Sequence, residues 1–219
     1  MIKHSTTHKQ ISKVLLALLL LLTLVLFSIK SVYAQQLTTI NVKENTATLI
    51  EEAPKEPLKN LAKVLQQKPL TLVGSAKFSV LFWDIYHSHL YTPSGEYLVK
   101  SNNNGMTEKS PSLLFEIQYL RDITKQDLIT RTIEQWQHLA ITAEQYNKFI
   151  PVLEAIWPDI KTDDSLALLI DNNLSHFYFN GNHIGTISHA SFGPLFTAIW
   201  LDPNTSQPKL RAKLIGENK

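Results

Sequence analysis

The sequence predicts an α+β fold in which helices are layered on one face of a large antiparallel sheet. Three observations lead to this prediction. Segments rich in β-branched and aromatic residues follow one another between residues 70 and 99 and again at 112–120. Two segments with a helical period come next, and a three-strand meander and two further helical segments complete the chain. Strands and helices grouped in such blocks are typical of this fold class.

The first block of strands is interrupted by turn residues. We expect strands at Leu70–Val73, Lys77–Trp83, Ile85–Tyr91 and Tyr97–Val99, divided by Gly74, Pro93 and Gly95. In Ser112–Leu120 the apolar residues occupy alternate positions, with Glu116 and Gln118 between them. This strand is therefore predicted to have one buried face and one wetter face.

Two helices are predicted in the middle of the chain, where the apolar period changes from two to nearly four. The first runs over Thr124–Leu139, and Thr124 can cap it. The second starts at Thr142, where Gln145 completes a capping box, and it ends at Trp157 because Pro158 follows. Pro151 is expected to bend the second helix.

The last part of the chain contains the clearest hairpin signal. We expect strands at Ser165–Ile170, Leu174–Phe179 and His183–Ile187, connected by turns at 171–173 and at Asn180–Gly181. Asn and Gly adopt the positive φ angles that a two-residue hairpin turn requires. Helical segments are expected near Ser191–Leu201 and Ser206–Leu214, and Gly216 is placed to end the last one.

The first 34 residues have the three parts of a signal peptide. Lysines precede an apolar run from Val14 to Ile29, and Val32-Tyr33-Ala34 suits a signal peptidase. The run is shorter than the roughly 20 residues of a typical membrane span, so we expect cleavage and a periplasmic or secreted protein. Contact with a membrane is expected only through a leader that remains uncleaved.

The remaining 185 residues are divided into a polar lead-in segment, 35–68, and one domain, 69–219. Loss of the leader removes four lysines and no acidic residue, which changes the formal net charge from +2 to −2. Nucleic acid is not an expected partner, because phosphate binding needs a concentrated basic patch. The chain has no cysteine, which excludes disulfides, thiolate metal sites and cysteine nucleophiles.

The order and spacing of several short segments resemble the bacterial chalcone isomerase-like family, which includes exported members. The resemblance covers most of Leu72–Gly216. It rests on the segments Val73-Gly74-Ser75-Ala76-Lys77, Ile85-Tyr86, Leu90-Tyr91, Glu134-Gln135-Trp136 with Leu139, Phe177–Gly185, Ala198–Thr205 and Leu210-Arg211. It implies an open-faced β-sandwich of chalcone isomerase type, with a ligand cleft between the sheet and the helices.

The resemblance also implies two modes of action. Some members close a chalcone by adding a phenolate oxygen across an enone, whereas others lack this activity and bind fatty acids through an arginine and a tyrosine. The family's arginine falls at Lys77, which keeps the charge but not the bidentate geometry. The family's catalytic threonine, tyrosine and asparagine fall near Leu81, Thr124 and Arg131. None of the three catalytic residues is therefore kept at its position.

The candidate ligand-binding residues are Lys77, Tyr86, Tyr91 and Arg131. Lys77 is expected to meet a carboxylate or enolate, with a hydroxyl from either tyrosine, and Arg131 to reach the same cleft. The alternative interpretation makes Lys77 a solvated edge charge and Arg131 an exposed helix charge.

Other constellations are weaker. His87 and His89 share one side of a strand, but two ligands make no metal site, so neither metal nor cofactor is expected. Hydrolase chemistry is disfavoured because the chain has no Gly-x-Ser-x-Gly elbow. Apolar residues of the segment near 191–201, including Trp200, are expected in the core or in the floor of an apolar pocket.

The leading hypothesis is an exported protein that binds a small apolar or amphipathic carboxylate, such as a fatty acid, between sheet and helices. The alternative is an intramolecular lyase, an isomerase acting on an enone-like substrate. A structural or partner-binding role remains a third possibility.

Overall fold

The computed structural model describes residues 60–97 and 112–217. The expected leader, the lead-in up to residue 59 and residues 98–99 of an expected strand lie outside the described residues. Among the helices that are described, none has the length and apolar character needed to cross a membrane.

Six antiparallel strands form one sheet, and each strand pairs with its neighbour in the chain. The strands are β1 (Thr71–Val80), β2 (Trp83–Thr92), β3 (Leu113–Tyr119), β4 (Ser165–Asp171), β5 (Leu174–Phe179) and β6 (Asn182–Ile187). The predicted alternating strand is β3, and the predicted meander is β4 to β6. The α+β prediction is confirmed.

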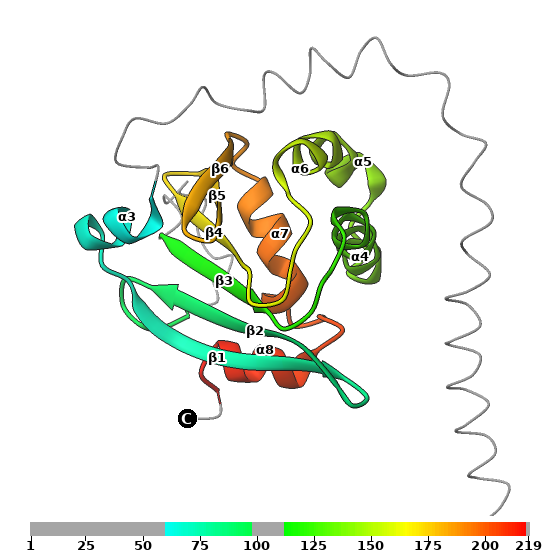
Figure 1. The fold of residues 1–219 in the computed structure, drawn as a ribbon, viewed down its shortest axis with the longest axis horizontal. Coiled ribbons are helices and arrows are strands. Elements are labelled where there is room, and N and C mark those ends of the chain that lie inside the picture. Colours follow the sequence, from blue (N-terminus) through cyan, green and yellow to red (C-terminus); the bar gives the residue numbers. More distant parts are fainter. Residues whose placement is uncertain (1–59, 98–111, 218–219) are drawn as a thin grey trace, which may run out of the picture. The chain divides into compact units, whose positions relative to one another are not determined.

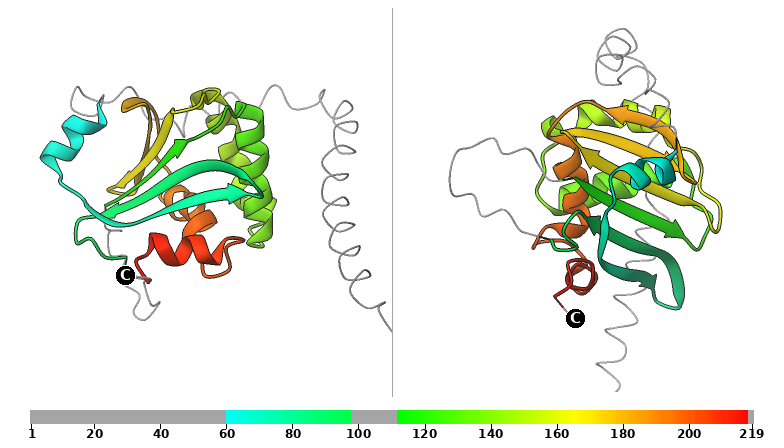
Figure 2. Two further views of the ribbon diagram at one scale, coloured as in Figure 1. Left: turned by 60° about the horizontal axis from the view of Figure 1, so that its bottom comes forward. Right: turned by 90° about the vertical axis from the view of Figure 1, so that its left-hand side faces the viewer.

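The helices that follow β3 in the chain cover one face of this sheet. They are α4 (Lys125–His138), α5 (Ala143–Tyr146) with the 3-10 turn η3 (Asn147–Phe149), α6 (Ile150–Ile156), α7 (Phe192–Leu201) and α8 (Pro208–Leu214). A further short helix, α3 (Leu61–Gln67), lies against the other face near β4 to β6 (Figure 1, Figure 2). We call the first face the helix face and the second the open face.

Alternation along the strands divides the buried residues between these two faces. On the helix face, Phe115 and Ile117 of β3 belong to a large core that includes Trp136 of α4. On the open face, Leu114 of β3 joins a small cluster with Leu61 and other residues. The helix α3, which belongs to the expected lead-in segment, therefore packs against the sheet.

The capping and turn predictions are confirmed. Thr124 Oγ1 accepts a hydrogen bond from Asp127 N at the start of α4, and Gln145 Oε1 accepts one from Thr142 N before α5. Asn180 and Gly181 form the β5–β6 turn with φ angles of 48° and 77°. The second central helix is divided into α5, η3 and α6 instead of being one bent helix, with Pro151 in the first turn of α6.

The prediction for the first strands is wrong in two respects. Gly74 does not divide a strand, and it lies within β1, where the backbone of α8 packs against it. A Cβ at Gly74 would lie 2.1 Å from the carbonyl oxygen of Lys213, so only glycine fits. The chain reverses instead at Leu81–Phe82, inside a predicted strand, because β1 ends at Val80 and β2 begins at Trp83.

Candidate functional site

Five aromatic side chains lie together on the helix face, between β1–β3 and the end of α7. The members of this aromatic cluster are Phe78, Tyr86, Phe115, Tyr119 and Trp200. The ring centroids of Phe78 and Tyr86 are 5.1 Å apart, and those of Phe115 and Trp200 are 4.6 Å apart. Phe115 and Tyr119 are buried, whereas the other three side chains are partly exposed. The aromatic cluster therefore offers apolar surface that a ligand can reach.

Tyr86 contributes the polar group of the aromatic cluster. Its hydroxyl oxygen accepts a hydrogen bond from Trp200 Nε1 at 2.9 Å. Burial raises the pKa of Tyr86 to about 12, although the bond from Trp200 acts in the opposite direction. The phenol is therefore neutral at physiological pH and keeps its proton. This proton has no acceptor among the residues that the structure describes, so Tyr86 can donate a hydrogen bond to a ligand.

Lys77 lies on the other side of the sheet from Tyr86. Phe78 pairs with Tyr86 and packs against the core of the helix face, so its neighbour Lys77 points to the open face. There, Lys77 Nζ donates to Asp84 Oδ2 at 2.8 Å, and both side chains are about half exposed. Hydrogen bonds from Lys77 and Ser79 lower the pKa of Asp84. The structure does not bring Lys77 and Tyr86 to one site.

The other two expected ligand-binding residues are also separated from Tyr86. Tyr91 follows the alternation of β2 to the open face and packs against the small cluster under α3. Arg131 lies on the exposed side of α4, where its Nη1 donates to Glu134 Oε2 at 2.7 Å. Of the four expected residues, Tyr86 alone belongs to the aromatic cluster.

The positions aligned with the family's catalytic residues are also apart. Leu81 is at the turn between β1 and β2, with 76% of its surface exposed. Thr124 uses its hydroxyl at the start of α4, where Oγ1 donates to Asp127 Oδ2. These positions and Arg131 form no cluster of polar groups around the aromatic residues.

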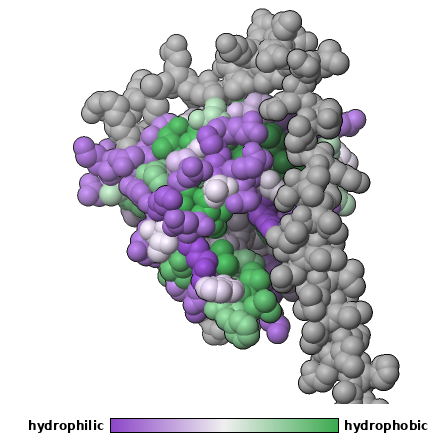
Figure 3. Space-filling model, turned by 45° about the vertical axis from the view of Figure 1, so that its right-hand side comes forward, coloured by the Kyte–Doolittle hydropathy of each residue, from purple (hydrophilic) through white to green (hydrophobic). Residues whose placement is uncertain are grey.

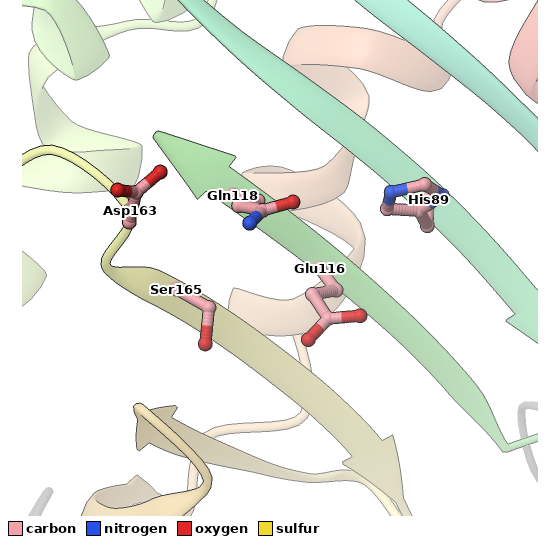
Figure 4. Close-up of a pocket in the computed structure, with 5 residues that line it drawn as sticks. All are labelled: His89, Glu116, Gln118, Asp163 and Ser165. Atoms are coloured by element: carbon pink, nitrogen blue, oxygen red, sulfur yellow. The ribbon is translucent and has the colours of Figure 1, made fainter. Parts of the chain in front are cut away.

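The open face has a polar groove of about 300 Å³. Five side chains from β2, β3, the turn before β4 and the first residue of β4 line it: His89, Glu116, Gln118, Asp163 and Ser165 (Figure 4). His89 Nδ1 is within 2.8 Å of Ser75 Oγ. No group of three potential metal ligands lies together within residues 60–97 and 112–217. The lining is hydrophilic, so this groove does not suit an acyl chain.

The hydrogen bond between Tyr86 and Trp200 was not predicted from the residue pattern. The two residues are 114 positions apart. Trp200 was expected in the core or in the floor of an apolar pocket, and its apolar neighbours give no signal for a polar contact. A hydrogen-bonded Trp–Tyr pair is common where an indole would otherwise bury its N–H group unpaired, but the partner is set by the tertiary fold.

Three comparisons place the chain among known proteins. A protein of Haemophilus influenzae described as uncharacterized is 22% identical over 147 residues, which are 67% of this chain and 68% of that protein. The crystal structure of a fatty-acid binding protein from Arabidopsis thaliana aligns with a TM-score of 0.48 and 12% identity, covering 68% of this chain and 87% of that one. The model of the chalcone isomerase-like family matches residues 57–216. The chain therefore belongs to the chalcone isomerase-like family.

Proposed function

We propose that this protein binds a small amphipathic carboxylate, such as a fatty acid, at the aromatic cluster on the helix face. The observation that supports the proposal is the hydroxyl of Tyr86. It is fixed by Trp200 Nε1, it is surrounded by aromatic rings, and its proton has no acceptor among the described residues. A site with one available donor and apolar walls suits a ligand with one acceptor group and a hydrocarbon body.

A carboxylate would be a stronger acceptor for this donor than a neutral group. A phenol whose pKa is about 12 remains a donor over the physiological range. A hydrogen bond to a charged acceptor contributes about 1.5 to 3 kcal/mol, more than a bond between neutral groups. The rings of Phe78 and Trp200, both partly exposed, provide apolar contact area for the hydrocarbon part of the ligand.

Removal of the Tyr86 hydroxyl tests the proposal. Tyr86→Phe keeps the ring and is expected to weaken binding of palmitate by roughly ten- to a hundred-fold, because the charge-assisted bond is lost. Binding of hexadecanol, which has no carboxylate, should fall much less. Isothermal titration calorimetry with both probes gives the two ratios.

The chain offers a matched control for this experiment. Tyr91 is on the same strand, but it points to the open face, so Tyr91→Phe should leave palmitate binding unchanged. Lys77→Ala should also have little effect at this site, because Lys77 lies on the open face and pairs with Asp84. Equal palmitate affinity in the wild type and in Tyr86→Phe would contradict the proposal. Loss of palmitate affinity in Lys77→Ala would instead show that the carboxylate binds to Lys77 on the open face.

We further propose that the protein acts outside the cytoplasm, after export by the leader at residues 1–34. Its lysines, its apolar run and the small residues before Gln35 support this proposal.

A further inference from the structure

The turn between β1 and β2 exposes four large apolar side chains in a row. We define the hairpin tip as Val80, Leu81, Phe82 and Trp83, whose residues are 47%, 76%, 94% and 54% exposed. It is the turn at the lower right of the fold in Figure 1, and Figure 3 shows a hydrophobic area at the lower end of the described surface. Soluble proteins rarely display adjacent large apolar residues in this way without a binding role.

The hairpin tip also has an unfavourable backbone conformation. Leu81 has a φ of 55°, in the left-handed region that leucine disfavours by about 1 to 2 kcal/mol. Two other hairpins of the same sheet place Asn172, Asn173, Asn180 and Gly181 at such angles, and these residues adopt them readily. Leucine at this position therefore lowers the stability of the fold through backbone strain, and its exposed side chain lowers the solubility. Strained and exposed residues of this kind are characteristic of functional sites.

A cation lies beside the hairpin tip. The guanidinium carbon of Arg121 is 3.9 Å from the centroid of the Trp83 ring. Arg121 forms no ion pair with an acid among the described residues, and its Nε has no hydrogen-bond partner there. The nearby Lys77 is neutralised by Asp84. The apolar side chains of the hairpin tip, among them Trp83, therefore lie beside Arg121, whose positive charge has no acidic partner among the described residues.

We propose that the hairpin tip docks on an anionic lipid surface. Leucine and phenylalanine would enter the acyl region, tryptophan would lie at the headgroup level, and the arginine would meet a lipid phosphate, as these side chains do at membrane interfaces. A protein partner or a second copy is less suitable, because stable interfaces bury about 1,200 to 2,000 Å² and need more than four side chains at a protruding turn. A bilayer surface needs no complementary shape.

The docking proposal is tested on the chain that begins at Gln35, the form expected after export, so that the apolar run of the leader cannot bind the vesicles by itself. Vesicles of equal parts phosphatidylcholine and phosphatidylglycerol are used, with bromine on the acyl chains. Insertion should quench the fluorescence of Trp83. Trp83→Phe should remove most of the quenching, because Trp136 and Trp157 are buried and Trp200 is only partly exposed, away from the hairpin tip in the aromatic cluster.

Phe82→Ser measures the apolar contribution. This substitution at the most exposed of the four side chains should leave folding intact and weaken vesicle binding about ten-fold in a sedimentation assay. Leu72→Ser is the matched control, because Leu72 is 45% exposed on the same hairpin but lies at the end away from the turn. It should bind vesicles as the wild type does.

Two further variants separate docking from a structural role. Leu81→Asn should raise the melting temperature, because asparagine adopts the left-handed angle more readily, while it lowers vesicle binding. Arg121→Gln should weaken binding to the anionic vesicles about five-fold and leave binding to pure phosphatidylcholine unchanged. A purely structural turn would give no opposite changes in stability and in vesicle binding.

The outcomes distinguish this proposal from ligand binding. Equal vesicle binding by the wild type and Phe82→Ser would overturn it, as would a dimer in solution that Phe82→Ser dissociates. Tyr86→Phe should leave vesicle binding unchanged, because Tyr86 is not part of the hairpin tip. Docking can therefore be confirmed or rejected whether or not palmitate binds at the aromatic cluster.

Discussion

His176 and His183 both lie within hydrogen-bond distance of the Thr186 hydroxyl on the open face, at β5 and β6. Thr186 Oγ1 is 2.8 Å from His176 Nδ1 and 2.9 Å from His183 Nε2. Burial, together with repulsion from His183, lowers the pKa of His176 from 6.5 to about 4. Burial also lowers the pKa of His183. Both imidazoles are therefore neutral in the folded protein at pH 7.

This pair predicts a loss of stability in mild acid. Above pH 6.5 His176 is neutral in both states, whereas between about pH 6.5 and 4 the unfolded chain binds a proton that the folded chain does not. The free energy of unfolding should therefore decrease over this window, by about 2 to 3 kcal/mol from His176. Urea unfolding at pH 7 and pH 5 measures the change. His176→Gln should flatten the dependence, and an unchanged slope in this variant would refute the assignment.

Lys77 and Tyr86 lie on opposite faces of the sheet, and the residue pattern alone could not predict this. Alternation in each strand was readable from the sequence, but the faces of two strands are matched only when their register is known. Here the register depends on the turn at Leu81–Phe82, which has no turn residue to mark it. The sequence therefore left open whether Tyr86 or Tyr91 lies near Lys77, and it could not show that Lys77 points away from Tyr86.

At the scale of elements, Gly74 connects β1 with α8. We expect Gly74→Ala to lower the free energy of unfolding by about 1 to 3 kcal/mol, because the new Cβ would lie 2.1 Å from Lys213 O and 2.5 Å from Leu214 O. Urea denaturation measures the loss. Ser75→Ala, one position along on the open face, removes only an exposed hydrogen bond to His89 and should change the free energy of unfolding by less than about 1 kcal/mol. Equal stabilities of the two variants would show that α8 can move away without cost.

The elements that the sequence predicted well carry their own local signals. The β5–β6 turn was found from Asn180–Gly181, and α4 from its cap and its apolar period, because turns and caps are determined within a few residues. Gly74 was misread as a strand break because its neighbour α8 lies at the far end of the chain. A glycine required by close packing and a glycine required by a turn have the same appearance in a sequence.

At the scale of the whole molecule, the leader proposal concerns residues outside the described part of the chain. Protein extracted from the producing cells should have the mass of a chain that begins at Gln35, because the small residue at Ala34 suits signal peptidase. Ala34→Phe should block this processing and leave a membrane-tethered form. Intact-mass measurement of both proteins tests the site, and wild-type protein that retains residues 1–34 would exclude cleavage there.

The contact between β1 and α8 also sets the order in which the molecule can be completed. A ribosome or an export channel delivers the chain from its N-terminus, and each strand can pair as soon as the next one appears. Val73 and Ala76 of β1 are buried in the same core as Leu210 and Leu214 of α8, and that helix emerges after all six strands of the sheet. Part of the first strand pair therefore stays uncovered until α8 has emerged, long after β1 and β2 can pair.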